Sequence, residues 1–178
     1  MHCLNRCRWL APLACLSISL AWVISGWSAA TPDDRARRSE LDAYWGAVSR
    51  SVREGDFEGY RATCHEEGVL VSGTSKTSYP LAQALERWKP GFLDTRAGNM
   101  TASVEFRFSQ RLGDATTAHE TGIFRYATTD ATGQAKTNFV HFEALLVKRT
   151  TWKILMEYQK GPATLADWEH LNQVAIHP

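Results

Sequence analysis

Apolar side chains recur at helical spacing in the first part of the chain. Five of them, three or four residues apart, would share one face of a helix: Leu41, Tyr44, Trp45, Val48 and Val52. Thr31 precedes Pro32 and two aspartates, and a hydroxyl cap, an early proline and acids in the first turn all favour a helix start. The pattern predicts a first helix of about 20 residues.

Two further helices and a brief strand are predicted before residue 100. Asp56 follows Gly55 and can cap a short second helix, with two aromatic residues turned inward, Phe57 and Tyr60. The phrase "GVLVSG" is an apolar run between glycines, which is typical of a short strand. Tyr79-Pro80 then opens a third helix, in which four apolar residues share one face: Leu81, Leu85, Trp88 and Phe92.

Beyond residue 100 the hydrophobic period changes to two. Alternation over residues 100–112 predicts a strand, Gly113-Asp114 a two-residue hairpin turn, and residues 115–128 the returning strand. The phrase "NFVHFEALLVKRTTWKILMEYQKG", residues 138–161, predicts two more strands around a turn at Thr150-Thr151. A short closing helix follows, where Thr164 and Asp167 have the spacing of a capping box.

The order of these elements indicates the fold class. Helices come first and a long meander of strands follows, which predicts an α+β domain with three N-terminal helices packed on one face of a curved, mainly antiparallel sheet. A short C-terminal helix completes it. No repeat, low-complexity tract or linker divides residues 31–178, so these residues are expected to form a single domain.

Several local phrases agree with this order: "EGDFEGY", "CHEEGVLVSG", "YPLAQALERW" and "LLVKRTTWKILMEY". Over roughly residues 36–160 the chain resembles the SnoaL-like group of the nuclear transport factor two superfamily. The resemblance implies a cone-shaped α+β fold around a pocket, dimerisation through the sheet, and reactions such as ketosteroid isomerisation, epoxide hydrolysis, dehydration or polyketide cyclisation. None of the phrases is a catalytic signature.

The chain departs from the family pattern at its acidic residues. Glu67 stands where relatives often have an aspartate, and Thr150-Thr151 stands where the last hairpin often turns through glycine. The pockets of the family commonly use an aspartate base. Every aspartate of residues 31–178 falls in a predicted helix, helix end, turn or loop, so a catalytic aspartate is not carried over.

Strand parity predicts which polar groups face the helices. A turn at Gly113-Asp114 pairs Phe108 with His119, which places His119 on the apolar face. In the last hairpin the same construction makes three pairs: Val147 with Ile154, Leu145 with Met156, and Glu143 with Tyr158. His141 shares that face because residues two apart in a strand point the same way. We therefore expect these polar groups to converge in the interior.

The expected site follows from this placement. Glu143 would act as proton acceptor, and Tyr158 and His141 would supply hydrogen bonds. Seven further residues are expected to line the ligand pocket: His119, Tyr44, Trp45, Trp88, Phe106, Phe108 and Met156. The leading hypothesis is an exported domain that binds a small, largely apolar molecule in this pocket.

Two alternatives stay open. One is a cofactor-free acid/base isomerase, hydratase or cyclase that uses Glu143 with Tyr158 and a histidine. The other is a structural or protein-interaction module, in which the polar groups merely complete a patch in the core. In the last two strands the opposite face is still apolar, which predicts a homodimer formed through the outer side of the sheet: Phe142, Ala144, Leu146 and Leu155.

The N-terminal segment indicates where the protein works. Arg6 and Arg8 precede an apolar stretch over residues 9–27, and three small residues follow, Ser28, Ala29 and Ala30. This pattern predicts an export signal over residues 1–30 and a periplasmic or secreted domain over residues 31–178. The alternative is an uncleaved anchor, in which case the membrane is contacted through this segment alone.

Composition excludes several function classes. The 178 residues carry 20 basic and 19 acidic side chains, a balance that does not favour nucleic acid. The sequence has no GxGxxG, P-loop, HExxH or GxSxG motif, so neither a nucleotide cofactor nor a metal is expected. Three of the 4 cysteines lie within residues 1–30, which leaves Cys64 without an internal disulfide partner and expected to be a small buried side chain.

Overall fold

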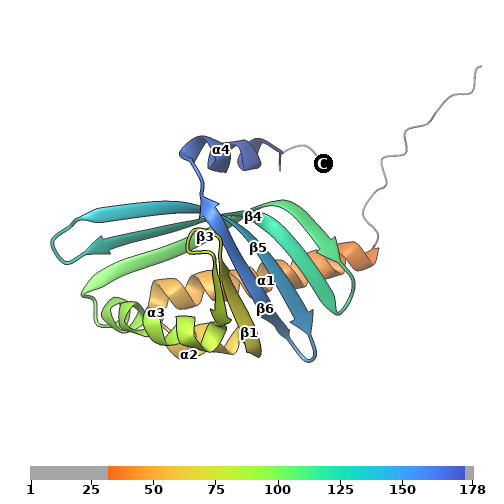
Figure 1. The fold of residues 1–178 in the computed structure, drawn as a ribbon, viewed down its shortest axis with the longest axis horizontal. Coiled ribbons are helices and arrows are strands. Elements are labelled where there is room, and N and C mark those ends of the chain that lie inside the picture. The colour runs from red at the N-terminus through yellow and green to blue at the C-terminus, as the bar shows by residue number, and fades with distance from the viewer. Residues whose placement is uncertain (1–31, 175–178) are drawn as a thin grey trace, which may run out of the picture.

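The computed structural model describes residues 32–174. The predicted export signal, residues 1–30, lies outside these residues, and export therefore stays a prediction. Three helices lie on one side of a curved sheet, and a fourth helix lies on the other side (Figure 1). Within residues 32–174, no helix is both long and apolar enough to cross a membrane.

The three N-terminal helices are α1 (Pro32–Glu54), α2 (Phe57–Ala62) and α3 (Leu81–Arg96). Gly55 has a positive φ of 66° between α1 and α2, and a Cβ there would lie 2.4 Å from the backbone nitrogen of Arg96. Only glycine allows this close approach of the turn to the end of α3. Asp56 then caps α2, because its side chain accepts a hydrogen bond from the backbone nitrogen of Gly59.

The sheet contains six strands, which are β1 (Cys64–Ser72), β2 (Thr77–Pro80), β3 (Met100–Gly113), β4 (Thr117–Asp130), β5 (Ala135–Lys148) and β6 (Trp152–Pro162). Their order across the sheet is β2-β1-β6-β5-β4-β3. β1 and β6 are parallel and the other neighbours are antiparallel. The predicted α+β architecture, with helices before a curved, mainly antiparallel sheet, is confirmed.

The fourth helix, α4 (Leu165–Val174), packs on the outer face of the sheet (Figure 1). Thr164 and Asp167 form the predicted capping box, in which each side chain accepts a hydrogen bond from the backbone nitrogen of the other residue. Trp168 is buried beneath the helix, and the guanidinium of Arg107 lies 4.0 Å from the centre of its ring. These contacts fix α4 against the strands.

The core fills the space between α1, α3 and the inner face of the sheet. Trp45 of α1 is its centre, with ring centroids 4.4 Å from Phe106, 5.6 Å from Phe108 and 5.8 Å from Phe142. Phe142 is almost completely buried. Burial of one such side chain contributes about 1.5–3 kcal/mol, so this aromatic group holds α1 on the sheet.

The β3–β4 hairpin differs from the predicted register. Its turn is longer than two residues, since Gly113 pairs with Ala118 and the Asp114 carboxylate accepts hydrogen bonds from the backbone nitrogens of Thr116 and Thr117. A β-bulge at Ser109 adds an unpaired residue to β3. As a result Phe108 pairs with Gly122 and not with His119.

The β5–β6 hairpin keeps part of the predicted register, but the face of β5 that meets the helices is the one predicted to point outward. Glu143 pairs with Tyr158 and Leu145 with Met156, as predicted, whereas Val147 pairs with Lys153 because Leu155 is a bulge. The side chains that enter the core are the ones predicted to face outward: Phe142, Ala144 and Leu146. The prediction of an apolar outer face built from these residues is wrong.

Candidate functional site

The polar groups predicted to converge in the interior lie on the outer face of the sheet. His119 Nε2 lies 3.3 Å from Glu143 Oε2, and Lys160 Nζ donates to Glu143 Oε1 at 2.8 Å. Tyr158 pairs directly with Glu143 and shares its face. His141 Nε2 lies 3.7 Å from Asp167 Oδ2 of the outer helix α4. The predicted inward orientation of these groups is wrong, because the apolar residues of β5 occupy the inner face.

The surroundings of Glu143 are those of a surface ion pair. The hydrogen bond from Lys160 lowers the pKa of this carboxyl group, and the small desolvation opposes that effect. Glu143 is therefore ionised near neutral pH and its charge is already paired. A base of the predicted kind needs a raised pKa in apolar surroundings, and this environment has the opposite effect.

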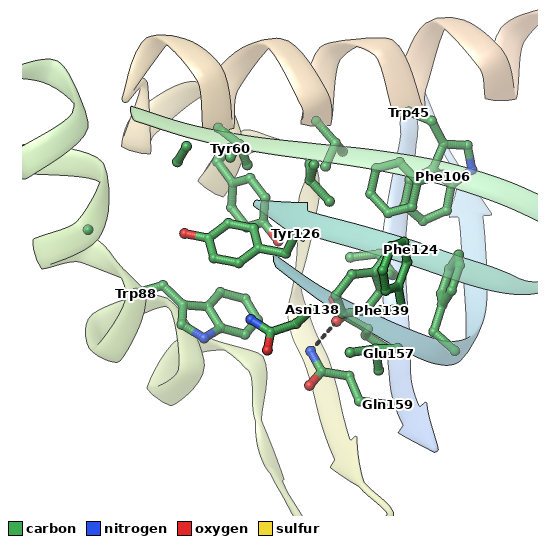
Figure 2. Close-up of a pocket in the computed structure, with 18 of the residues that line it drawn as sticks. Trp45, Tyr60, Trp88, Phe106, Phe124, Tyr126, Asn138, Phe139, Glu157 and Gln159 are labelled. Atoms are coloured by element: carbon green, nitrogen blue, oxygen red, sulfur yellow. Dashed lines mark hydrogen bonds between the residues drawn. The ribbon is translucent and has the colours of Figure 1, made fainter. Parts of the chain in front are cut away.

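A large cavity opens on the inner face of the sheet, between β4, β5, β6 and the helices (Figure 2). Its volume is about 860 Å³. Ten aromatic residues contribute to its lining: Tyr44, Trp45, Tyr60, Trp88, Phe92, Phe106, Phe124, Tyr126, Phe139 and Phe142.

Four of the seven predicted pocket residues line this cavity: Tyr44, Trp45, Trp88 and Phe106. The other three do not. Met156 and His119 both pair with Leu145 and lie with it on the outer face. Phe108 faces inward but packs against the Trp45 ring and is not part of the cavity lining.

One wall of the cavity carries a carboxyl group that was not predicted, that of Glu157. Because Leu155 is a bulge, the inner face of β6 passes from Trp152 and Ile154 to Glu157 and Gln159. The Nε2 atom of Gln159 donates to Glu157 Oε1 at 2.7 Å. Figure 2 shows both side chains in the cavity together with Asn138 of β5 and Tyr126 of β4.

Burial raises the pKa of Glu157, and the hydrogen bond from Gln159 offsets only part of this effect. Two phenols near it are perturbed in the same direction. Burial raises the pKa of Tyr60 and of Tyr44, and the nearby charge of Glu157 adds to both shifts. The cavity therefore favours the protonated, neutral form of Glu157 beside neutral phenols.

Cys64 lines the same cavity and is not suited to nucleophilic chemistry. Burial raises the pKa of its thiol to about 12, so the reactive thiolate is scarce at neutral pH. Its sulfur lies 3.7 Å from the carbonyl oxygen of Tyr60. The predicted role as a small buried side chain agrees with this environment.

A second acid on the inner face, Glu120, serves a different purpose. Its side chain is completely buried, accepts a hydrogen bond from the Trp45 indole, and is bound by Arg111 Nε at 2.5 Å. Arg111 also binds Asp42 of α1 at 2.5 Å. Each oxygen of Glu120 accepts a hydrogen bond from a protein donor, one of which is the Arg111 cation, and the side chain is completely buried. This group therefore joins α1 to the sheet and is not exposed to a ligand.

No metal site is evident within the described part of the chain. Residues 32–174 contain no group of three or more His, Cys, Asp or Glu side chains placed to hold a metal ion.

Glu157 was missed because the residues before it do not alternate. Ile154, Leu155 and Met156 are all apolar, so the sequence carries no period-two signal through them and the position of the bulge cannot be read. The only available signal is local. Glu157 and Gln159 are two residues apart, which places them on one face of a strand without saying which face.

Comparison with known proteins identifies the fold. No protein-family model matches the sequence, and no curated protein matches it. Solved structures do: a conserved protein from Planctomyces limnophilus is 8% identical with a TM-score of 0.59, and the alignment covers 70% of this chain and 95% of that one.

Two more solved structures are described as nuclear transport factor 2-like. The protein from Salmonella enterica serovar Typhimurium is 11% identical with a TM-score of 0.54, over 74% of this chain and 94% of that one. The protein from Shewanella oneidensis is 16% identical with a TM-score of 0.52, over 68% of this chain and 97% of that one. The chain therefore has the cone-shaped α+β fold of the nuclear transport factor 2-like superfamily.

Proposed function

We propose that this domain binds a small, largely apolar molecule in its inner cavity, with Glu157 as the polar contact. The observation that carries the proposal is the cavity itself. Its volume of about 860 Å³ falls within the range of roughly 300–1,000 Å³ that is usual for ligand sites. Apolar residues, ten of them aromatic, make up most of its lining, and polar side chains are the minority, which is the composition of sites that bind largely apolar ligands.

Packing energetics support an occupied cavity. Protein interiors contain few voids larger than a water molecule, because an empty space deprives the surrounding side chains of dispersion contacts. The aromatic side chains of α1, α3 and the sheet leave this space open. A ligand that fills it restores those contacts.

Gly91 of α3 provides a direct test of binding in this cavity. It lines the cavity, and a Cβ built on it meets no atom within 4 Å, so Gly91→Leu extends into open space without a backbone clash. A naphthalene-sized probe, 2-naphthylmethanol, should bind the wild type in calorimetry and bind Gly91→Leu at least about tenfold more weakly.

The matched control is Gly46→Leu on α1. This glycine also has no atom within 4 Å of a built Cβ, but it lies outside the lining of the large cavity. Binding of 2-naphthylmethanol should be unchanged in this variant. Failure of the probe to bind the wild type, or equal weakening in both variants, would refute binding in this cavity.

Glu157 also favours a second function, acid/base catalysis of an isomerisation, hydration or cyclisation. Its raised pKa and the neighbouring Tyr60 phenol supply a proton carrier and a hydrogen-bond donor at one place. The role first predicted for Glu143 would then belong to Glu157. Exchange of the α protons of 2-tetralone in D₂O, followed by NMR, should be accelerated by the wild type and not by Glu157→Gln. No acceleration by the wild type would count against this function.

The assembly and the location of the protein remain proposals. The homodimer was predicted from an apolar outer face of the sheet, and the structure does not provide that face. Phe142, Ala144 and Leu146 point inward, and α4 packs against the outer side of β3. Native mass spectrometry of the exported protein would report the number of chains, the N-terminus and any retained molecule together. The same measurement tests the third hypothesis, since a module that acts only through its outer face would retain no small molecule.

A further inference from the structure

We propose that the molecule bound in the cavity carries a protonated amine, which Glu157 binds while the surrounding aromatic rings hold the apolar body. This inference rests on the proposed binding function and specifies the chemical class of the ligand. It depends on three features of the cavity. These are an acid without a cationic partner, a glutamine that adds a second acceptor oxygen beside that acid, and a wall of aromatic rings.

Glu157 lacks the partner that a buried acid normally has. Gln159 gives it one hydrogen bond, and no Lys, Arg or His side chain of residues 32–174 forms an ion pair with it. A carboxylate accepts about four hydrogen bonds, so most of its acceptor capacity is unused. A desolvated carboxyl group without a cation is costly, and a cationic ligand would remove that cost.

Gln159 adds a second acceptor beside the acid. Its Nε2 atom is directed to Glu157, and its amide oxygen is therefore turned away from that carboxyl group (Figure 2). The two side chains together offer oxygen atoms to a bound molecule. An ammonium group has three donors and no acceptor, whereas a ketone or a carboxylate brings only acceptors. The polar wall is thus complementary to an amine.

The rest of the cavity is compatible with a cation. Tyr60, Trp88 and Tyr126 line it, and the negative π-face of an aromatic ring attracts a cation. Arg87 is the only basic residue of the lining, and it is exposed, with its guanidinium 4.5 Å from the centre of the Tyr79 ring. Its guanidinium thus contacts a ring outside the lining, and the rest of the lining holds one acid and no basic side chain.

Proton linkage makes this inference measurable. Burial raises the pKa of Glu157, so the free protein holds this proton to a higher pH than an exposed glutamate does, whereas an ammonium ion favours the ionised carboxylate. Binding then releases a proton to solvent, and the affinity for an amine rises with pH through the pKa of Glu157. A ligand that accepts a hydrogen bond from the protonated acid shows the opposite trend.

The other titratable groups of the cavity do not produce this effect. They come from four elements: Tyr44 of α1, Tyr60 of α2, Cys64 of β1 and Tyr126 of β4. Burial raises the pKa of each of them, so all four stay neutral near pH 7.

Calorimetry with two matched probes tests the inference. The probes are 2-naphthylmethylamine and 2-naphthylmethanol, which have the same ring system and differ in the amine and the hydroxyl group. At about pH 8 the amine, still largely protonated, should bind the wild type about 10- to 100-fold more tightly than the alcohol. Its affinity should fall toward about pH 5, and titrations in buffers of different ionisation enthalpy should show proton release.

Two variants assign the effect to one carboxyl group. Glu157→Gln, which keeps the side-chain shape, should bring the affinity for the amine down to that of the same variant for the alcohol and should remove the pH dependence of amine binding. Glu143→Gln on the outer face is the matched control and should change neither probe. The pH dependence and the proton release of the wild type need no variant, so the test survives poor folding of Glu157→Gln.

The outcomes separate the inference from the proposed function. If neither probe binds the wild type, binding in the cavity fails. If the alcohol binds as tightly as the amine, or the affinity of the amine falls as pH rises, the cavity binds ligands but the amine assignment is overturned. An amine preference that persists in Glu157→Gln overturns it as well.

Discussion

Glu120 and Glu157 are both acids on the inner face of the same sheet, but their surroundings differ. Glu120 is bound by Arg111 and by the Trp45 indole, and Arg111 is bound in turn by Asp42. Glu157 has one neutral partner, Gln159, and otherwise faces a cavity. One acid is satisfied by the fold, and the other keeps acceptors for something that the fold does not supply.

The difference shows how to separate structural acids from functional ones. Burial alone does not decide, because Glu120 is the more buried of the two and its charge is already paired with Arg111. The useful observation is unused hydrogen-bonding capacity beside open space. By that criterion the outer acid Glu143, whose charge is paired with Lys160, is also a poor candidate.

The largest effect is expected at Glu120. Glu120→Ala leaves the Arg111 guanidinium and the Trp45 indole without their buried acceptor. Breaking a buried pair in this way costs about 3–5 kcal/mol, so the free energy of unfolding in urea should fall by that amount. A loss below about 1 kcal/mol would mean that the two acids do not differ as described.

Glu157→Leu should raise the free energy of unfolding, whereas Glu120→Ala should lower it. Removal of the carboxyl group leaves no buried cation unpaired, and leucine replaces a desolvated polar group with an apolar one. We expect the free energy of unfolding to rise by about 1–2 kcal/mol near pH 8, measured in the same urea titrations. Destabilisation by more than about 2 kcal/mol would contradict an unpaired Glu157.

The pH dependence of stability sharpens the contrast. The pKa of Glu157 is raised on folding, so the folded state binds the proton more tightly than the unfolded state does. Stability is then greatest below the unfolded pKa and falls as pH rises through the raised value. Compared with Glu157→Gln, the wild type should lose stability as pH rises from about pH 4.5 to neutral pH. Thermal melts over this range would check the sign.

The smallest effect is expected at Glu143. Its pKa is lowered by Lys160, so its contribution is present above the unfolded pKa and disappears as pH falls through the lower folded value. Glu143→Gln should cost about 0.2–1 kcal/mol near neutral pH, because the pair is partly exposed. The difference should vanish below about pH 3 and shrink in high salt. A larger cost would indicate a role beyond a surface ion pair.

Much of the fold could be predicted from local pattern. The stripe from Leu41 to Val52 predicted α1, since a helix that packs on a sheet must repeat its apolar residues at helical spacing. The pairing of Glu143 with Tyr158 was also predicted, because turn position sets the register of a hairpin. The candidate site was predicted only in part, through aromatic residues of α1, α3 and β3 that line the cavity.

The sequence by itself determined the helices, five of the six strands and part of the pairing within the last hairpin, because each depends on neighbours along the chain. Only the tertiary structure decided which face of each strand meets the helices. The bulges at Ser109 and Leu155 add one residue each, and a shift of one residue exchanges the two faces of a strand. The bulge at Leu155 takes the inner face of β6 from Ile154 to Glu157, whereas Glu143 faces outward because Phe142, Ala144 and Leu146 of its own strand fill the core.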